Sequence, residues 1–495
     1  MIVNDKKIND FLKFLKKQNK DIILAHGVFD LIHIGHIKHF NSIKKYKKNS
    51  LFIVSITSDR HVNKGINRPY FNEEFRSELL SNIKIIDHVI INNEKTPLNL
   101  LSKIKPKIYL KGEEYKKKDI TGNIDKETSI VKKNGGNIIF TKDITFSSSV
   151  LINKNFLKID ENYRQKIINF KKKEYLHKIT QILDDLKKCR ISIIGETIID
   201  EYIQLKPRSK LSKENIISNE KIKTLKYQGG AFAIANYLSN FIDKLQIFTN
   251  TPDKHKIKKL KNIIINKYPK TNNNKIIKTR YLDYNFNNKL FAVYSVPSLS
   301  NEKLGSSVKI NLDKFDKIII NDFGHGLING THSIKNLKKY EYKICLNVQT
   351  NSFNYGFNLL TKYRGLNPKF ICIDENEARL AVSDNKSEID YILKKLHKLF
   401  PSSNIIITRG KLGSVFFSKN KINHVPVLTE TVVDTMGAGD IYFATASLFC
   451  HHCEDLELIA FISNLAAGLK ANILGHSRSI TKIELLKYAE TILKI

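Results

Sequence analysis

The chain has 495 residues, of which 41% are hydrophobic and 26% are charged. This length suits two or three domains, and this composition excludes a disordered or fibrous protein. The formal net charge of +35 invites a nucleic-acid function, but the lysines are spread through both halves of the chain. Dispersed lysines favour a solvated basic surface over a specific nucleic-acid footprint. No apolar run is long enough to cross a membrane, so we expect no membrane partner.

The five cysteines are scattered, and the closest two, Cys450 and Cys453, enclose two histidines. No second CxxC pair completes a zinc site, which favours buried or surface thiols over a metal centre. The first 20 residues carry apolar side chains at helical spacing, interrupted by lysines, unlike a signal peptide. These features together predict a protein of the reducing cytoplasm.

Residues 22–56 alternate an apolar strand, a tight turn, an amphipathic helix and a second strand, and the alternation continues to about residue 143. This pattern predicts a parallel α/β domain over residues 1–150. Residues 151–188 are lysine-rich and helical in pattern, which predicts a connector. A second α/β series follows and predicts a domain over residues 189–495. The expected fold class is therefore α/β, with two doubly wound domains.

Two imidazoles lie three residues apart behind the first strand, in the segment GVFDLIHIGH at residues 27–36. The N-terminus of a helix favours an anion, and His33 and His36 can donate hydrogen bonds as negative charge grows on a nucleotide α-phosphate. Gly35 lets the backbone approach the phosphate closely. An HxGH motif alone is a weak signal, but its place after a buried strand favours nucleotidyl transfer.

Residues 20–150 resemble the cytidylyltransferase-like family of nucleotidyltransferases, on this segment and on three later ones. SDRHVNKGINRPYFNEEFRSELL resembles the family's loop and helix, where Lys64 would contact phosphates and Arg76 would anchor the helix or a substrate. KGEEY, which begins at Lys111, resembles the family's KGxDY-type turn. FTKDITFSSSVLIN resembles the segment whose hydroxyl groups cap a helix over the phosphates, with Lys142 where an arginine is common.

This resemblance implies a Rossmann-like domain with His33 and His36 as catalytic residues. The nucleotide- and phosphate-binding residues that it implies are Gly27, Phe29, Asp30, Gly35, Lys64, Arg76, Lys111, Ser147, Ser148 and Ser149.

The segment VDTMGAGD at residues 433–440 is the most specific motif of the chain. Consecutive small residues that open a helix present backbone amides to a phosphate, and Asp440 can accept the proton of an attacking hydroxyl. Phosphoryl transfer depends mainly on positioning and on neutralisation of charge, and the motif provides both.

Residues 189–495 resemble the ribokinase-like, phosphofructokinase-B type sugar kinases, on IIGETIIDEY, QGGAFAIANYL, NDFGHGLI, IDENEARLA, ITRGKLGS and SNLAAGLKA in that order. Three positions depart from the family: Ala233 and Asp374 each replace an asparagine, and His325 replaces a lysine. At NVQTNS, residues 347–352, the heptose kinases have an acidic and a basic residue.

The kinase resemblance implies Asp440 as catalytic base. It implies ATP-side contacts at Thr408, Gly410, Gly413, Gly437, Ala438, Gly439 and Asn464, sugar contacts at Asp200, Gly229 and Gly230, and Mg²⁺ held through water by Glu377 and Asp374. Arg280 is a candidate handle for an anionic sugar, and an ordinary surface arginine is the equal alternative.

A class I aminoacyl-tRNA synthetase is the main alternative, because residues 33–36 spell HIGH and residues 210–214 spell KLSKE. The second motif lies beyond the apparent domain break, and a synthetase leaves DTMGAGD unexplained. A basic nucleic-acid-binding protein is a further alternative.

The two halves fit one sequence of reactions. A kinase makes a phosphate ester, and a nucleotidyltransferase of this type uses such an ester to attack a nucleoside triphosphate and expel pyrophosphate. The combination resembles the bifunctional heptose kinase/adenylyltransferases of lipopolysaccharide precursor synthesis, with the domain order reversed. We expect a cytoplasmic enzyme that phosphorylates a heptose-like sugar or sugar phosphate with ATP and activates it with ATP or CTP. Mg²⁺ is expected at both sites, the expected partners are small-molecule sugars and nucleotides, and a homodimer stays open.

Overall fold

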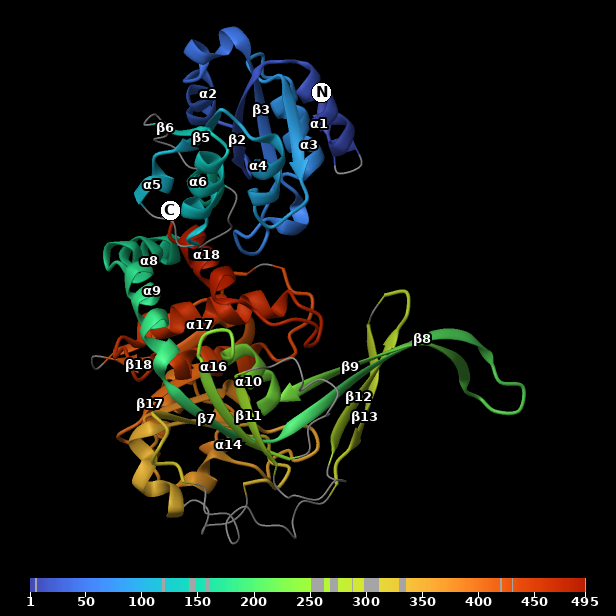
Figure 1. The fold of residues 1–495 in the computed structure, drawn as a ribbon. Coiled ribbons are helices and arrows are strands. Elements are labelled where there is room, and N and C mark those ends of the chain that lie inside the picture. Colours follow the sequence, from blue (N-terminus) through green and yellow to red (C-terminus); the bar gives the residue numbers. More distant parts are fainter. Residues whose placement is uncertain are drawn as a thin grey trace. The chain divides into compact units, whose positions relative to one another are not determined.

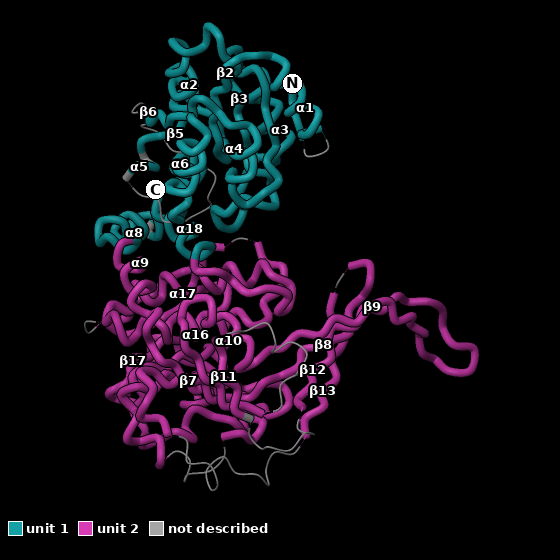
Figure 2. The backbone as a smooth tube through the Cα atoms, viewed as in Figure 1, with its two compact units in different colours: residues 1–176, 483–495 teal, residues 177–482 magenta. Residues whose placement is uncertain are grey.

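A computed structural model describes residues 1–4, 7–117, 121–141, 148–155, 161–250, 262–267, 275–286, 288–297, 311–328, 335–418, 421–429 and 431–494. The chain forms two compact units (Figure 2). Unit 1 contains Met1–Leu176 and Ile483–Ile495, and unit 2 contains His177–Lys482. The expected boundaries at residues 150 and 188 do not coincide with the unit boundaries. Residues 151–176 and the last segment of the chain pack with unit 1 instead.

Unit 1 is built on a parallel sheet, whose described strands have the order β1-β4-β3-β2-β5-β6 (Figure 1). Successive side chains of a strand point to opposite faces, and here both faces are covered. On β2, Ile23 and Ala25 lie in one buried apolar cluster and Leu24 lies in another. The strands are β1 (Ile2–Val3), β2 (Asp21–Gly27), β3 (Ser50–Thr57), β4 (His88–Asn92), β5 (Ile108–Gly112) and β6 (Asn137–Thr141).

The helices of unit 1 follow the amphipathic pattern of the sequence. In α1, Phe11 and Leu15 are buried while the lysines face solvent. The helices are α1 (Ile8–Lys17), α2 (Ile34–Asn41), η2 (Lys44–Asn49), η3 (Asp59–His61), α3 (Glu73–Ser81), α4 (Leu98–Ile104), α5 (Glu114–Lys117), α6 (Asn123–Lys133), α7 (Ser148–Asn155) and α8 (Glu161–Lys172). Two helices cross the unit boundary, α9 (Tyr175–Asp185) and α18 (Lys482–Ile492).

Unit 2 contains a larger sheet, whose described strands have the order β11-β10-β7-β14-β15-β16-β17-β18-β19. The first seven strands of this order run parallel, and β18 and β19 pair in antiparallel fashion. These strands are β7 (Arg190–Gly195), β10 (Lys244–Thr249), β11 (Ile263–Lys267), β14 (Lys317–Asp322), β15 (Ile344–Val348), β16 (Phe370–Asp374), β17 (Asn404–Thr408), β18 (Ser414–Ser418) and β19 (Lys421–Val425).

The helices of unit 2 complete its α/β architecture. Helices α16 and α17 pack against each other and are buried on nearly every side, as their apolar sequences predict. The helices are η4 (Leu186–Lys188), α10 (Ala231–Leu238), η5 (Lys338–Lys343), η6 (Leu360–Tyr363), α14 (Glu375–Ala381), α15 (Ile389–Leu399), η7 (Gly410–Leu412), α16 (Ala438–Phe449) and α17 (Leu456–Ala471). The expected α/β fold with parallel sheets is therefore confirmed in both units.

A second, four-stranded sheet of unit 2 has the order β13-β12-β8-β9. Its strands are β8 (Thr197–Lys210), β9 (Ile217–Gly230), β12 (Ile276–Asp283) and β13 (Lys289–Ser295). Beyond Leu205, strand β8 pairs only with β9, and the two strands continue as a projecting ribbon (Figure 1). Across the described part of the chain, every helix is too short or too polar to cross a bilayer.

The backbone at Gly65 predicts a measurable effect on the stability of unit 1. Gly65 has φ +94°, and a Cβ atom there would lie 2.0 Å from the ring of Tyr488. Gly135 has φ +78° and open space around it. Gly135→Ala therefore carries only the backbone strain, about 1 kcal/mol, whereas Gly65→Ala adds an overpacking cost of about 1–3 kcal/mol. Native-state hydrogen exchange of unit 1 measures both, and equal costs would contradict the Tyr488 packing.

Candidate active sites

The N-terminal site lies at the point where the strand order of unit 1 reverses. Strand β2 has β3 on one side and β5 on the other, so the connections that follow these strands diverge. In doubly wound sheets, ligands bind beyond the carboxyl ends of the strands at such a point. The loop that leads to the HxGH motif begins directly after Gly27, the last residue of β2, and Lys111 is the next-to-last residue of β5.

The first turn of α2 fixes the orientation of both imidazoles that were predicted as catalytic. The Nδ1 atom of His33 accepts a hydrogen bond from the amide of Gly35 at 3.1 Å, and the Nδ1 atom of His36 accepts one from the amide of His33 at 3.3 Å. The ring centroids are 4.0 Å apart. Because each Nδ1 atom accepts a hydrogen, the proton of each neutral ring resides on Nε2. Both histidines thus carry an Nε2–H donor that the helix cap does not use.

Burial keeps these imidazoles neutral. It lowers the pKa of His33 below the usual value. Burial, together with the charges of His33, His39 and Lys64, lowers the pKa of His36 to about 3. A neutral imidazole has no net charge and can donate one hydrogen bond to an anion. Both rings therefore present a neutral, oriented N–H group at this site.

The aromatic ring of Phe29 packs against the ring of His36. Its ring lies 5.4 Å from the His36 ring in an edge-to-face arrangement, and its backbone has φ +50°. The same ring lies against Gly27, where an added Cβ would be 3.1 Å away. Gly27 and Phe29 were predicted as nucleotide-binding residues; in the structure Gly27 makes room for the Phe29 ring, which contacts His36, and their contact with a nucleotide stays a prediction.

Asp30 is buried and holds the loop that follows η3. Its Oδ1 atom accepts hydrogen bonds from the amides of Tyr70 at 2.7 Å and Phe71 at 3.0 Å. Its Oδ2 atom pairs with Arg68 at 3.4 Å, and both side chains are almost fully buried. Asp30 therefore positions the loop, and its predicted role in nucleotide binding stays a prediction.

Arg76 is 1% exposed and donates only to protein acceptors in the described structure. Its guanidinium reaches the carbonyl oxygens of Phe71, Val28 and Thr57 at 2.9, 2.5 and 2.9 Å, and the carboxylate of Asp59 at 2.6 Å. Of the two roles that the sequence left open for Arg76, this geometry favours the anchoring role.

The two predicted lysines differ in their surroundings. Lys64 is half-buried, and burial together with nearby positive charges lowers its pKa to about 8. Lys111 is buried and paired with Glu127 at 2.8 Å, and it also lies over the Tyr109 ring. Lys64 is therefore the cation of this pair that is better placed to meet a phosphate.

The serine cluster opens α7. Ser148 and Ser149 are buried, and the Ser148 hydroxyl donates to the carbonyl of Leu31 at 3.0 Å. This bond brings the start of α7 to the loop between β2 and the HxGH motif. Ser147 and Lys142 lie outside the described residues.

In unit 2, the start of α16 forms the kinase candidate. Gly437 caps the helix with φ +75°, a conformation that a side chain disfavours. The amide of Ala438 donates to Thr435 at 3.1 Å. Among the described residues, the amides of Gly439 and Asp440 meet no backbone acceptor. The loop therefore offers two free amides at a helix N-terminus, which is an anion-binding arrangement.

The Asp440 carboxylate is held on one side only. Its Oδ1 atom accepts hydrogen bonds from Gln349 at 2.6 Å and Asn321 at 3.3 Å, whereas Oδ2 meets no partner among the described residues. Burial raises the pKa of Asp440, and the charge of Asp200 raises it further. Sequence reasoning missed Gln349 and Asn321. Their places at the carboxyl ends of the adjacent strands β14 and β15 were the signal that could have found them.

A buried lysine fixes the loop before α16. Lys470 is 2% exposed and donates to the carbonyl of Met436 at 2.6 Å. The ring of His476 closes the other side of Gly437, where an added Cβ would lie 2.7 Å from the ring. Asp434 accepts from the amide of Gly475 at 2.9 Å and from Lys289 at 3.0 Å.

The predicted sugar-binding residues gather beside the second sheet. Asp200 and Arg280 form a buried ion pair at 2.6 Å, so Arg280 is not a surface arginine. A Cβ on Gly229 would lie 2.1 Å from the Asp200 carboxylate, which explains why no side chain fits there. Gly230 has φ +59° and caps α10. Lys278 was missed by sequence reasoning: it is buried, and its ammonium interacts with the charges of Asp200 and Arg280.

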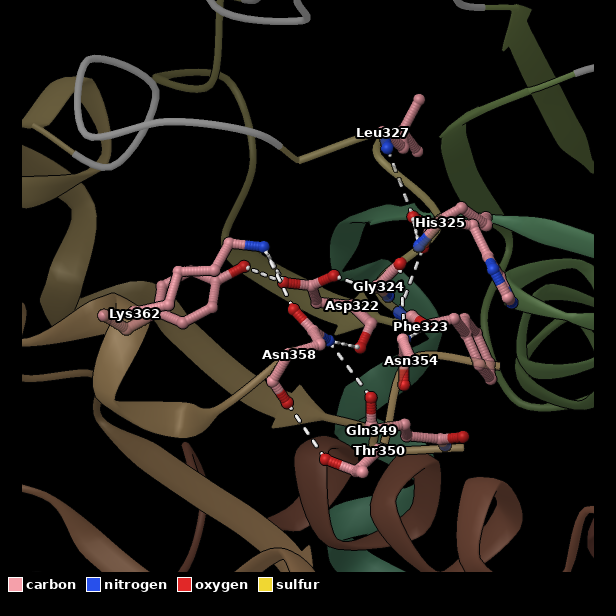
Figure 3. Close-up of polar contacts among 12 residues, drawn as sticks. Asp322, Phe323, Gly324, His325, Leu327, Gln349, Thr350, Asn354, Asn358 and Lys362 are labelled. Carbon is pink, nitrogen blue, oxygen red and sulfur yellow. Dashed lines mark hydrogen bonds and ion pairs between the residues drawn. The ribbon is translucent and has the colours of Figure 1, made fainter. Parts of the chain in front are cut away.

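Asp322 and Glu196 hold the loop that follows β14 (Figure 3). The Asp322 carboxylate accepts from Lys362 at 2.6 Å and from the Tyr363 hydroxyl at 2.8 Å. The Glu196 carboxylate accepts from three loop amides, among them that of His325 at 3.1 Å. The His325 ring points away from this network, and neither of its nitrogens has a partner among the described residues (Figure 3). Burial lowers the pKa of His325 to about 4.

The predicted magnesium residues begin α14. Asp374 caps the helix by accepting from the Glu377 amide at 2.7 Å, and the Glu377 carboxylate accepts from the amides of Asp374 and Thr350 at 2.8 and 3.1 Å. Burial and the charge of Asp374 together raise the pKa of Glu377 to about 8. Since backbone amides occupy Glu377, these residues fit contact with Mg²⁺ through water rather than direct ligation.

The predicted ATP-side residues lie around β17 and β18. Thr408 ends β17, and Gly410 and Gly413 have φ +53° and +85°. A Cβ on Gly413 would lie 2.1 Å from the carbonyl of Val425. Asn464 is buried and donates to the same carbonyl at 3.3 Å. Asn464 therefore braces β19, and its contact with adenine stays a prediction.

Two other motifs of the sequence fall elsewhere. KLSKE lies at the turn between β8 and β9 in unit 2, whereas HIGH lies in unit 1. Neither unit alone therefore contains the pair of motifs that a synthetase uses.

The sulfur of Cys450 lies 3.3 Å from that of Cys345, and all five cysteines are free. Cys453 instead lies against the backbone of Asp455.

Two family models match this chain. Residues 24–155 match the cytidylyltransferase-like family, and residues 347–482 match the pfkB family of carbohydrate kinases. The first range contains every residue predicted for the N-terminal site. The second contains Asp440 and the predicted ATP-side and magnesium residues. The predicted sugar residues, Asp200, Gly229, Gly230 and Arg280, precede it.

Curated relatives and solved structures were also found. The bifunctional protein HldE of Campylobacter jejuni serotype O:2 is 39% identical over 123 residues, which cover 24% of this chain and 26% of that protein. The HldE protein of Campylobacter concisus is 36% identical over 119 residues, covering 23% and 25%. A ribokinase from Thermotoga maritima has 16% identity and a TM-score of 0.48, covering 62% of this chain and 100% of that one.

The match to the HldE proteins falls on the N-terminal domain, and the chain spans about a quarter of their length. The order of the two family matches is that expected from the sequence. The chain thus carries a cytidylyltransferase-like domain at residues 24–155, followed by a pfkB family carbohydrate kinase domain at residues 347–482.

Proposed function

We propose that this protein phosphorylates a sugar or sugar phosphate with ATP and then transfers a nucleotidyl group to the resulting phosphate ester. The observation that carries this proposal is the presence, in one chain, of a kinase domain and a nucleotidyltransferase domain. The first makes a phosphate ester and the second consumes one. The product is a nucleotide-activated sugar, and the leaving group of the second step is pyrophosphate.

In the kinase reaction, Asp440 acts as the general base. Gln349 and Asn321 hold its Oδ1 atom, which leaves Oδ2 to accept the proton of the attacking sugar hydroxyl. The free amides of Gly439 and Asp440 stabilise the transferring phosphoryl group. Mg²⁺, when bound with ATP, neutralises phosphate charge, and Glu377 and Asp374 would hold it through water.

The sugar side of this site favours an anionic sugar substrate. Arg280, Lys278 and Lys289 surround the Asp200 and Asp434 carboxylates. Such a group of cations and carboxylates can bind both sugar hydroxyls and a phosphate on the same sugar. A sugar that already carries one phosphate before the kinase adds another would agree with the candidate role of Arg280 as a handle for an anionic sugar.

In the nucleotidyl transfer, His33 and His36 donate Nε2–H hydrogen bonds to the α-phosphate of the nucleoside triphosphate, ATP or CTP. These bonds strengthen as a sugar phosphate oxygen attacks and negative charge grows. Lys64 balances charge on the departing pyrophosphate while its ammonium remains protonated. The neutral state of both histidines in the free site avoids repulsion of Lys64 before the substrate binds.

Asp440→Asn should abolish sugar phosphorylation and leave nucleotidyl transfer intact. The amide cannot accept the hydroxyl proton, whereas its size and its bonds to Gln349 and Asn321 are largely kept. Asp313→Asn, an exposed carboxylate of unit 2, serves as the control. ADP release and pyrophosphate release are measured separately, the latter with a supplied sugar 1-phosphate. A near-normal phosphorylation rate in Asp440→Asn would remove it from the role of base.

His36→Ala should slow nucleotidyl transfer about a hundredfold to a thousandfold, because it removes a donor that acts in the transition state. Sugar phosphorylation should be unchanged, so sugar phosphate accumulates. The exposed His177 gives the matched control, His177→Ala. Product analysis by mass spectrometry follows both steps. Equal slowing of the two reactions would argue against separate sites.

A further inference from the structure

The last segment of the chain, Ile483–Lys494, belongs to unit 1 although it follows the kinase domain in the sequence (Figure 2). It lies outside both family matches. In unit 1 it contacts the loop after η3, residues 62–71, which carries Lys64. Three kinds of contact join the two segments.

The first contact is a close packing of Tyr488 on Gly65. Tyr488 is 2% exposed, and its ring occupies the space where any side chain at residue 65 would begin. Gly65 is the neighbour of Lys64 in the sequence. The ring therefore fixes the backbone directly beside the phosphate-binding lysine.

The second contact is a chain of buried hydrogen bonds that runs to Asp30. The amide of the Asn153 side chain donates to the carbonyls of Thr491 and Lys494 at 2.6 and 2.9 Å. Its oxygen accepts from Arg68 at 2.6 Å, and Arg68 pairs with Asp30. Asn153 is fully buried, so leaving any of these groups unpaired is costly.

The third contact is electrostatic. Lys494 and Lys487 both pair with Glu490, at 3.1 and 2.9 Å, and remain partly exposed. Two ammonium groups share one carboxylate, so this end of α18 keeps a net positive charge. That charge acts on Lys64, and Lys494 has the larger influence of the two.

We propose that Ile483–Lys494 is a working part of the nucleotidyltransferase site, in which α18 positions the Lys64 loop and the charge of Lys494 adds to the positive charge around Lys64. This inference rests on the proposed function of unit 1 for its activity readout. Lys494 acts beside Lys64 and is a positioning residue. The nucleotidyltransferase site then requires residues from both ends of the chain.

The charges around Lys64 set the expected pH dependence. Burial, together with the charges of Lys494, Arg68 and Lys487, lowers its pKa to about 8, and the charge of Asp30 opposes this lowering. His36 also faces Lys64 and is neutral in this range. Lys64 is charged below its pKa, so kcat/KM for nucleotidyl transfer should fall as pH rises through about 8. Loss of the Lys494 charge raises the Lys64 pKa and moves this fall to higher pH.

The test compares Lys494→Met with Lys494→Arg and with Lys154→Met in the full-length protein. Lys154 is exposed on α7 and matches the change in net charge. Lys494→Met should raise KM for the nucleoside triphosphate about tenfold and move the alkaline limb upward. Lys494→Arg should restore both, Lys154→Met should change neither, and sugar phosphorylation should stay constant in all three. A merely structural role for Lys494 would not move the alkaline limb.

Calorimetric titration with inorganic pyrophosphate separates this inference from the proposed function. The variants share an identical kinase domain, so a difference in binding arises in unit 1. We expect about tenfold weaker pyrophosphate binding in Lys494→Met than in Lys154→Met. Normal binding and an unmoved alkaline limb in Lys494→Met, or no binding by the wild type, would overturn the inference. Weakened binding in a protein that transfers no nucleotide would instead overturn the proposed function alone.

Discussion

Both sites depend on one constraint: the first turn of an α-helix leaves backbone N–H groups without acceptors. At α2, imidazole nitrogens accept hydrogen bonds from two of these amides. At α16, the amides of Gly439 and Asp440 meet no backbone acceptor among the residues that the structure describes. Each helix follows a strand of a parallel sheet or lies at its carboxyl edge, which is where ligands bind in doubly wound folds. In the proposed function, the same arrangement of oriented N–H donors serves two different phosphate reactions.

Such donors are effective only if the surrounding loops and side chains have fixed positions. Buried ion pairs fix these positions in both units. Arg68 pairs with Asp30 beside the imidazoles, and Arg280 pairs with Asp200 in the proposed sugar site of unit 2. In both pairs the side chains are nearly inaccessible to solvent, so removal of one partner leaves an unpaired buried charge. Rigid surroundings of this kind let oriented hydrogen bonds act without reorganisation during the reaction.

The fold and the two motifs were predictable from the sequence, because each motif is contiguous and sits where an apolar strand gives way to a helix. The α/β prediction needed only the alternation of apolar runs. The partners of Asp440 were not predictable, since Gln349 and Asn321 come from separate strands whose order is set by tertiary packing. The bond from Asn153 to Thr491 spans 338 residues, and no local pattern reveals it. For Arg76 the family pattern left two roles open, and only its burial among carbonyl groups favours one.

The most direct test of the account is a product analysis by mass spectrometry. The full-length protein is incubated with Mg²⁺, ATP or CTP, and a panel of sugars and sugar phosphates that includes heptoses. The account predicts a nucleotide-linked sugar whose formation releases both ADP and pyrophosphate, with the sugar phosphate as an intermediate. Amino-acid-dependent exchange of pyrophosphate into ATP, without any nucleotide-linked sugar, would contradict it.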